Sequence, residues 1–501
     1  MAIAHSQARA LIDQVWEAEV LPALCDYIGI RCLSPAFDHE WRSHGQMDEA
    51  VTLIRDWCAG RPIDGLRIER VDLPDRTPVL LAEIPPTAGA SPVTGSAAAD
   101  AISDDATPRT VLLYGHLDKQ PEMSGWREGL GPWTPVLDGE RLYGRGGADD
   151  GYAAFAALTA IQAVHAGLGE HARCVVLVEA SEESGSPDLG AYVDHLADRM
   201  GQVDLVICLD SGTKSYDRLW VTTSLRGMAA MDVRATVLTE GVHSGAAGGV
   251  VPSSTDVLRL LLDRIHDPLT GKMPVPELNV AIPAEAVERA QCSAEGLEGG
   301  LRASFPFAGG TQPLVEDTVE RLLNQTWRPS MEVIAASGIP AVGEGGNVLR
   351  PMTELQLSFR LPPTADPDDA VAALRAELTR DPPFGATVQV EVLTAEAGWA
   401  APPGAPWLAD ALDEASLAAY GQTARSMGEG GTIPFMAMLG RRFPDAQFVV
   451  AGVLGPNSNA HGPNEFLHVP YAKGLTHAVA HVLDAHGRHR GRTHAVGGRA
   501  S

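Results

Sequence analysis

Three mostly apolar segments, each followed by polar residues, constrain the fold of this chain most. They read TVLLYG at 110–115, CVVLVEA at 174–180 and VDLVICL at 203–209. Between them, residues 150–168 and 188–200 carry apolar side chains at helical spacing. Strands that are apolar on both faces and alternate with helices are typical of a parallel sheet covered on both sides. The sequence therefore predicts an α/β fold with a mostly parallel sheet, in which ligands bind beyond the carboxyl ends of the strands.

A second pattern fills the stretch from 223 to 396. Its strands, such as 226–238 and 353–363, alternate apolar and polar residues, and helical segments such as 367–380 lie among them. Alternation predicts antiparallel strands with one exposed face, and the combination predicts a small α+β domain of the ferredoxin-like kind. A separate C-terminal domain would give a similar pattern. Because buried strands and helices return after 397, we expect an insertion into the larger domain instead.

These patterns divide the chain into four parts. We expect the larger domain at 1–222 and 397–486, the inserted domain at 223–396, and a disordered, basic tail at 487–501. Residues 87–108 are rich in Ala, Ser, Asp and Gly without periodicity, which indicates a long surface loop.

Composition narrows the possible partners and the compartment. The net charge is −26, with acidic residues spread along the chain, so neither nucleic acid nor an anionic membrane is an expected partner. No apolar run approaches the length of a membrane span, and the N-terminus lacks a basic region followed by an apolar core. The six cysteines fall at irregular spacings without a Cys-x-x-Cys, so we expect free thiols, mostly buried, in a reducing compartment. A cytoplasmic protein is predicted.

Acidic or histidine side chains follow each apolar strand, and they also end a glycine-rich turn and a later apolar strand. They are His116, Asp118, Asp149, Asp150, Glu182, Glu183, Asp210 and His461. Each pair alone is typical of a solvated surface or a structural hydrogen bond. Their repetition at one edge of a sheet favours a binding site, because converging carboxylates repel one another unless a cation lies among them. A pair of divalent metal ions would remove the repulsion and acidify a water molecule for hydrolysis.

Eight short strings in a fixed order carry a resemblance to a known family. They are YGHLD, YGRGGADDG, EASEESGS, CLDSG, VHSG, SFRLPP, GEGGTIP and NAHGPNEF. With them the chain resembles the zinc-dependent exopeptidase superfamily of carnosinase, cytosolic nonspecific dipeptidase, acetylornithine deacetylase and aminoacylase, and it is most similar to the dipeptidase branch. The likeness runs from His116 to Glu465. It implies a catalytic larger domain, an inserted dimerisation and lid domain, and a hydrolase that cleaves the amide bond of a dipeptide or similar small substrate.

The resemblance also implies a set of metal ligands. His116 and Asp210 would hold one ion, Glu183 and His461 would hold the other, and Asp149 would bridge both. The family points to two zinc ions. Carboxylate and imidazole ligands of this kind also suit manganese or cobalt.

Catalytic roles follow from the same resemblance. Glu182 would be the general base that takes a proton from the attacking water and later delivers it to the leaving amine. Asp118 would orient His116. The peptide bond between Asp149 and Asp150 would be cis, as it is in the family.

In the inserted domain, the resemblance implies residues that contact the substrate. His243 would reach the partner subunit's active site and stabilise the oxyanion, which makes a homodimer part of the catalytic apparatus. Arg360 would bind the substrate's terminal carboxylate, and Asn347 would lie near the oxyanion or the substrate backbone. The string GEGGTIP would offer backbone N–H groups and a hydroxyl to the same carboxylate, from Gly430, Gly431 and Thr432.

The chain departs from the family pattern at two places, and this leaves the substrate open. The family usually follows its paired aspartates with lysine, whereas Gly151 and Tyr152 stand here, and EASEE replaces its usual EGEEE or EGMEE. Neither departure removes a ligand or the base. An N-acyl-amino-acid deacylase, of the acetylornithine or succinyl-diaminopimelate type, would use the same residues. A non-catalytic homologue that binds a small molecule is the third reading, and the complete ligand set disfavours it.

Overall fold

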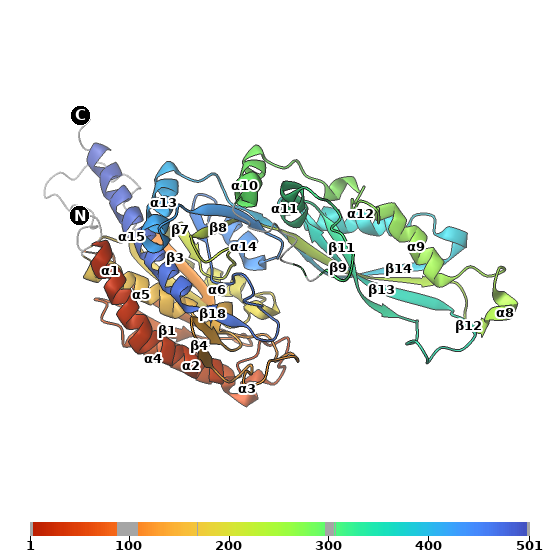
Figure 1. The fold of residues 1–501 in the computed structure, drawn as a ribbon, viewed down its shortest axis with the longest axis horizontal. Helices are drawn as coiled ribbons and strands as arrows, with labels where there is room; N and C mark the ends of the chain where they lie inside the picture. The colour runs from red at the N-terminus through yellow and green to blue at the C-terminus, as the bar shows by residue number, and fades with distance from the viewer. Residues whose placement is uncertain (1–3, 88–108, 168, 296–304, 306, 498–501) are drawn as a thin grey trace. The chain divides into compact units, whose positions relative to one another are not determined.

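The computed structural model describes residues 4–87, 109–167, 169–295, 305 and 307–497. The chain forms two compact units (Figure 1). The first unit comprises Met1–Thr222, Ala401–Ser426 and Met438–Ser501, and the second comprises Thr223–Ala400 and Met427–Ala437. The second unit therefore interrupts the first. The loop expected at 87–108 lies outside the described residues from position 88 onward.

One stretch groups differently from the sequence-based division. Residues Met427–Ala437 belong to the second unit, although the sequence pattern assigns everything from 397 to 486 to the larger domain. The reason is a set of polar contacts that hydrophobic periodicity does not encode. Thr223 Oγ1 donates to the Met427 carbonyl oxygen at 3.1 Å, and Arg226 Nε donates to the carbonyl oxygen of Gly430 at 3.2 Å.

A mixed sheet of nine strands, counted among the described residues, contains the three apolar segments. The strand order is β1-β2-β6-β3-β7-β17-β8-β15, and β16 pairs with β8. The bounds are β1 Arg67–Val71, β2 Val79–Ile84, β3 Arg109–His116, β6 Arg173–Glu179, β7 Gln202–Cys208, β8 Trp220–Leu225, β15 Trp399–Ala400, β16 Arg425–Glu429 and β17 Gln447–Val450. Strands β6, β3, β7 and β17 run parallel, whereas β1, β2 and β8 pair antiparallel. The α/β class is confirmed, with parallel order confined to the centre of the sheet.

Helix α5, Ala153–Ala166, shows why the central strands carry apolar side chains on the face that it covers. Every residue from Ala153 to Val164 is buried, because α5 packs between strands β3 and β6 and helices α1 and α15. Its many alanines leave room for this close approach on all sides. The helix starts directly after the paired aspartates, so its position in the core fixes the turn that precedes it.

The remaining elements of the first unit surround this core (Figure 1). They are α1 His5–Val15, η1 Trp16–Val20, α2 Leu21–Gly29, α3 Trp41–His44, α4 Gln46–Ala59, β4 Val136–Asp138, β5 Arg141–Tyr143, η2 Gly147–Gly151, η3 Glu182–Ser184, α6 Leu189–His195, α7 Ala197–Met200, α13 Pro406–Tyr420, β18 Phe466–His468 and α15 Val469–Gly497. Helix α14, Pro434–Arg442, begins in the second unit's last stretch and ends in the first unit. Strands β18, β5 and β4 form a small sheet of their own.

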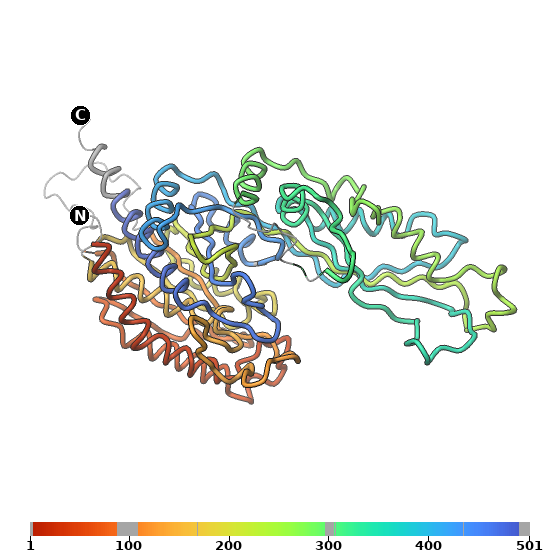
Figure 2. The backbone as a smooth tube through the Cα atoms, in the orientation of Figure 1, coloured from red at the N-terminus to blue at the C-terminus, as the bar shows by residue number. Residues whose placement is uncertain are grey.

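Helices α1 and α15 come from opposite ends of the chain and lie side by side (Figure 2). Trp16 Nε1, directly after α1, donates to Thr476 Oγ1 at 3.0 Å. Helix α15 continues to Gly497, so the tail expected to be disordered from 487 is helical as far as this residue. Glycines and basic residues after 487 weaken the helical pattern in the sequence. In the structure, Arg488 pairs with Asp484 at 2.9 Å and His489 stacks on Trp407, and both contacts support the helix there.

The second unit contains a four-stranded antiparallel sheet in the order β11-β13-β9-β14. Along β9, buried and half-buried residues alternate strictly, as the sequence pattern predicts. Helices α9 and α12 cover the buried face, where Met231, Leu261 and Leu374 share one core. The elements are β9 Gly227–Thr236, β10 Val242–His243, α8 Ser244–Ala247, α9 Ser254–Ile265, η4 Pro276–Leu278, α10 Ala284–Glu295, α11 Thr318–Thr326, β11 Ser330–Ser337, β12 Val348–Leu349, β13 Met352–Leu361, α12 Pro367–Thr379, η6 Pro383–Gly385 and β14 Thr387–Glu396.

Two further expectations concern membrane spans and thiols. Across the described ranges, no helix has both the length and the apolar character that crossing a bilayer requires. Cys25, Cys32, Cys58, Cys174 and Cys208 are free thiols, and all of these except Cys25 are buried. The expectation of free and mostly buried thiols is confirmed.

Candidate active site

The polar residues that follow β3, β6 and β7 meet at one edge of the central sheet. His116 is the last residue of β3, Glu182 and Glu183 form η3 just after β6, and Asp210 follows β7 by two residues. Parallel pairing brings these ends together, since β3 lies between β6 and β7 in the sheet. The fold thus delivers the expected residues to one place.

The first cluster consists of His116, Asp149 and Asp210. One possible ligand atom from each lies within 4.8 Å of the others, and all three side chains are buried. His116 Nε2 is 3.4 Å from Asp149 Oδ1 and 3.9 Å from Asp210 Oδ2. Two carboxylates and an imidazole at this spacing can hold one divalent cation.

The second cluster consists of Asp149, Glu183 and His461. His461 Nε2 lies 3.0 Å from Asp149 Oδ2 and 3.4 Å from Glu183 Oε2. Gln120 Nε2, a residue that the sequence motifs do not single out, donates to Glu183 Oε2 at 2.7 Å. Asp149 therefore belongs to both clusters, with one carboxylate oxygen directed to each.

Asp118 organises the turn that carries the two glutamates. Its Oδ1 accepts the backbone N–H of Glu182 at 3.1 Å and its Oδ2 accepts that of Glu183 at 3.0 Å. The Asp118 carbonyl oxygen accepts from His116 Nδ1 at 3.1 Å, and the carboxylate is 3.5 Å from the same nitrogen. A carbonyl oxygen only accepts, so in the neutral ring this contact places the His116 proton on Nδ1 and leaves the Nε2 lone pair for a ligand in the first cluster.

The turn at Asp149 and Asp150 has the expected geometry. The peptide bond between them is cis, which confirms the prediction. Asp150 turns away from the clusters, and its Oδ2 accepts the backbone N–H of His116 at 3.2 Å. A Cβ at Gly151 would lie 2.1 Å from Tyr27 Cε1 and 2.6 Å from the Gly146 carbonyl oxygen. The lysine that the resembling family carries after its aspartates has no room here.

A buried ion pair links this turn to the loop of His461. Arg145 Nη1 lies 2.5 Å from Glu465 Oε2, and both side chains are almost fully buried. Glu465 Oε1 accepts the Gly146 N–H at 2.9 Å, and Arg145 Nη2 donates to the Gly462 carbonyl oxygen at 2.9 Å. Sequence reasoning assigns no role to Arg145 or Glu465, although the strings YGRGGADDG and NAHGPNEF contain them.

The pKa values reflect several carboxylates crowded into one buried space. Burial raises the pKa of Glu182, and the charge of Asp210 raises it further, well above its usual value. Burial likewise raises the pKa of Asp210 to about 6, against the opposing effect of His116. Asp149 is the exception, because His116 and His461 outweigh its burial and hold the pKa of this carboxyl well below its usual range. Its carboxylate is the most firmly ionised of the three.

The chemistry of these donors fits a pair of divalent cations. His116 Nε2 and Glu183 Oε1 are buried without a hydrogen-bond partner, an arrangement that costs stability unless another ligand satisfies them. Two cations would satisfy both atoms and offset the repulsion that raises the pKa values of Glu182 and Asp210. The residues that would hold them are His116 and Asp210 on one side, Glu183 and His461 on the other, and Asp149 between.

The residues predicted in the inserted domain form two pairs within the second unit. His243 ends β10, and the backbone N–H of the next residue donates to the Asn347 carbonyl oxygen at 2.9 Å. Arg360 Nη1 donates to Thr432 Oγ1 at 3.0 Å. Arg226, which sequence reasoning does not single out, supports the second pair through its contact with Gly430. Beside it lies Gly431, the last residue of the predicted set.

The sheet and the paired clusters define a class first: an α/β metallohydrolase fold in which two candidate metal-ligand clusters share one aspartate. The profile of Peptidase family M20/M25/M40 matches residues 112–485, and the chain belongs to this family. The resemblance seen in the sequence motifs is thereby confirmed.

Known relatives include dipeptidases. The chain is 27% identical over 387 residues to the cysteinylglycine-S-conjugate dipeptidase of Corynebacterium striatum, which covers 76% of this chain and 81% of the relative. The fold is similar to that of human carnosine dipeptidase 1, with a TM-score of 0.72, 21% identity, and 96% and 98% of the two chains covered. It is also similar to that of a Bacillus subtilis protein described as a dinuclear metal binding peptidase, with a TM-score of 0.50, 12% identity, and 95% and 98% covered.

Proposed function

We propose that the protein is a dipeptidase that hydrolyses the amide bond of a dipeptide or similar small substrate with a free carboxylate. The observation that carries the proposal is Asp149, whose two carboxylate oxygens are directed to two separate ligand clusters, one buried and one that opens to solvent at His461. The dipeptidase names of the relatives support the substrate class. Two divalent cations, with zinc as our proposal, would supply a water of lowered pKa and polarise the scissile carbonyl.

Proton transfer is assigned to Glu182. It neighbours the clusters without being a member of either, and Asp118 holds its backbone in place. Its carboxylate takes the proton of the attacking water and passes it to the leaving amine. A raised pKa suits this exchange, because the group must gain and lose a proton within one turnover.

Binding of the substrate's free carboxylate is assigned to the second unit. Arg360 offers a planar guanidinium, and its bond to Thr432 Oγ1 holds it in one orientation. The backbone N–H groups of Gly430 and Gly431 would add donors to the same carboxylate. His243 and Asn347 are assigned to the oxyanion.

A homodimer completes the proposal, with His243 acting in the partner's site. Strand β11 supports it, because it is the edge of its sheet and carries Val333 and Ile334 with 47% and 57% of their surfaces exposed. An exposed apolar edge strand is a ready surface for pairing with a second copy. The free cysteines support a reducing, cytoplasmic compartment for this dimer.

The decisive test is Glu182→Gln in the metal-loaded enzyme. Activity on a dipeptide panel is expected to fall by at least about 10²- to 10⁴-fold while the metal content is unchanged, because the amide cannot carry the proton. Metal analysis and hydrolysis assays of the same samples check this. Full activity in the variant would exclude the mechanism. If the wild-type enzyme hydrolysed N-acetylated or N-succinylated amino acids but no dipeptide, the protein would be a deacylase and the proposed dipeptidase function would be wrong.

A further inference from the structure

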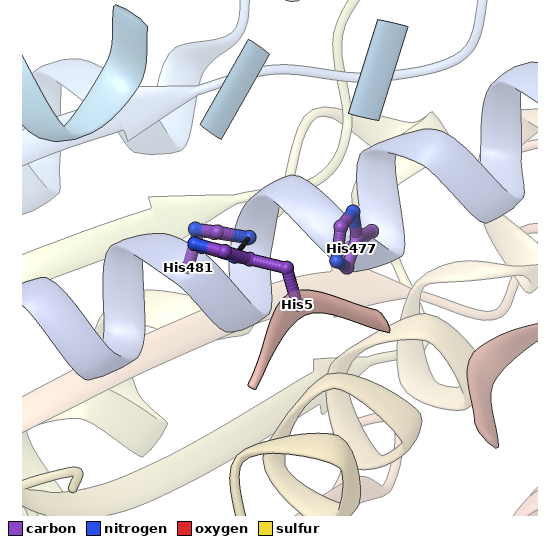
Figure 3. A group of neighbouring side chains, drawn as sticks. All are labelled: His5, His477 and His481. Carbon is purple, nitrogen blue, oxygen red and sulfur yellow. Dashed lines mark hydrogen bonds between the residues drawn. The ribbon is translucent and has the colours of Figure 1, made fainter. Parts of the chain in front are cut away.

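Three histidines gather outside the active site, where the two ends of the chain meet. His5 is the first residue of α1, and His477 and His481 lie one turn apart on α15. Figure 3 shows the ring of His5 stacked on that of His481, with His477 further along the same helix. One ring nitrogen from each residue lies within 4.8 Å of the others. This is a metal-ligand spacing that the hydrolytic function does not use.

The geometry of the cluster comes from both helices. Positions 477 and 481 are four apart, so their side chains share one face of α15. The rings of His477 and His481 meet edge to face, with centroids 4.7 Å apart. His5 Nδ1 lies 2.6 Å from His481 Nε2, and these two rings are nearly parallel. His5 is exposed, so its ring can turn and the cluster is reachable from solvent.

His477 is the most deeply buried ring of this cluster. The residue is 1% exposed, and neither Nδ1 nor Nε2 forms a hydrogen bond of good geometry, although the backbone of His5 lies close enough to raise the pKa of the ring. A neutral imidazole always carries one N–H donor and one acceptor, and buried polar atoms are normally satisfied. A ligand that accepts a lone pair from the ring would remove part of this cost.

Protonation and charge agree with cation binding. Burial lowers the pKa of His477 to about 4 and that of His481 to about 3, so both rings are neutral at pH 7, the form that binds metals. Arg9 and Arg488 lower these pKa values further. Both arginines are themselves paired, Arg9 with Asp13 at 3.3 Å and Arg488 with Asp484 at 2.9 Å, which offsets their repulsion of a cation.

We propose that His5, His477 and His481 bind one divalent transition-metal ion, for which Zn²⁺ is the probe. Because its ligands come from α1 and α15, this ion links the two helices. Imidazole nitrogens suit Zn²⁺, Cu²⁺ and Ni²⁺, and three of them leave one position for water. Since the ligands come together in the folded chain, binding stabilises the folded state. The site is structural and separate from hydrolysis.

The test compares the full-length enzyme with His5→Ala and, as control, His39→Ala. Both histidines are exposed, so neither substitution opens a cavity, and His39 is not a member of the cluster. With the active site loaded, wild type and His39→Ala are expected to bind one more Zn²⁺ per chain than His5→Ala, or to bind it at least about ten-fold more tightly. Added Zn²⁺ should raise their Tm and leave that of His5→Ala unchanged. All three proteins should hydrolyse substrate equally.

Equal zinc content and equal Tm responses in wild type and His5→Ala would overturn the proposal. A crystal of the wild-type enzyme soaked in Zn²⁺ gives a second measurement that needs no variant. An anomalous peak among the three rings supports the site, and its absence with the active site occupied excludes it. Loss of activity in His5→Ala would contradict the claim that this metal site is separate from catalysis.

Discussion

At the scale of single residues, Asp149 differs from the other carboxyl groups of the site, because its pKa is lowered whereas those of its neighbours are raised. Its Oδ1 lies 3.4 Å from His116 Nε2 and its Oδ2 lies 3.0 Å from His461 Nε2. These histidines keep it ionised despite burial, while burial and neighbouring carboxylates raise the pKa values of Asp210 and Glu183. Asp150, next in the chain, takes no part and binds backbone instead. One aspartate of the doublet is thus placed for chemistry and the other for position.

Gly151→Ala should destabilise the protein by about 1 to 3 kcal/mol, because overpacking of this size forces the backbone to move. The added Cβ would lie 2.1 Å from Tyr27 Cε1 and 2.6 Å from the Gly146 carbonyl oxygen, which cannot swing aside like a side-chain tip. Thermal unfolding measures the loss. Gly190→Ala is the matched control, since a Cβ there meets nothing within 4 Å. An unchanged Tm for Gly151→Ala would mean that the turn has more room than the structure gives it.

His171 gives the protein a sensitivity to acid. It is fully buried, its Nδ1 donates to the Ala172 carbonyl oxygen at 2.7 Å, and burial lowers its pKa to about 4. Because the folded pKa lies below the unfolded value of about 6.5, its stability contribution is present above pH 6.5 and is lost as the pH falls towards 4. Asparagine keeps a donor near Nδ1 but does not titrate. From pH 7.5 to pH 4.5, the wild type should therefore lose about 2 to 3 kcal/mol more unfolding free energy than His171→Asn does. A constant difference in urea unfolding would refute this.

At the scale of elements, the sequence predicts the helices and strands. It does not predict the polar contacts that hold the loops between them in place. The apolar runs that became β3, β6 and β7 predict both the sheet and the edge where His116, the glutamates of η3 and Asp210 meet. Periodicity says nothing of polar contacts between distant loops. The bond from Gln120 to Glu183 and the pair of Arg145 with Glu465 therefore emerged in the structure. For the same reason the sequence misplaced the stretch after Met427.

Glu465→Ala tests whether the buried pair holds two elements together. Removal of Glu465 leaves Arg145 buried without its partner, and such a loss typically costs about 3 to 5 kcal/mol. The affinity for the metal ion at the His461 cluster should fall as well, because Arg145 also binds the neighbouring Gly462 carbonyl oxygen. Urea unfolding and metal titration measure the two effects. Glu19→Ala, which removes the half-exposed partner of Arg61, should cost less than about 1 kcal/mol. Equal costs for both variants would show that burial of the Arg145 pair carries no special weight.

At the scale of the whole molecule, the predicted site residues divide between two units. The proposed metal ligands and Glu182 belong to the first, whereas His243, Asn347, Arg360 and Thr432 belong to the second. In our proposal a complete site also needs the second copy of the chain, because His243 serves the partner. An edge strand with exposed apolar residues is the surface in the second unit that suits this pairing.

Mixing two inactive variants tests the partner's contribution directly. His243→Ala and Glu182→Gln should each be nearly inactive alone. After subunit exchange, a mixed dimer contains one site with an intact Glu182 and an intact His243 from the other chain. With random pairing of equal amounts, activity should recover to about a quarter of the wild-type value, since half of the dimers are mixed and each has one working site. Unmixed variants and a dilution of wild type with Glu182→Gln are the controls. If the mixture stays inactive although mass spectrometry detects mixed dimers, His243 acts within its own chain or has no catalytic role.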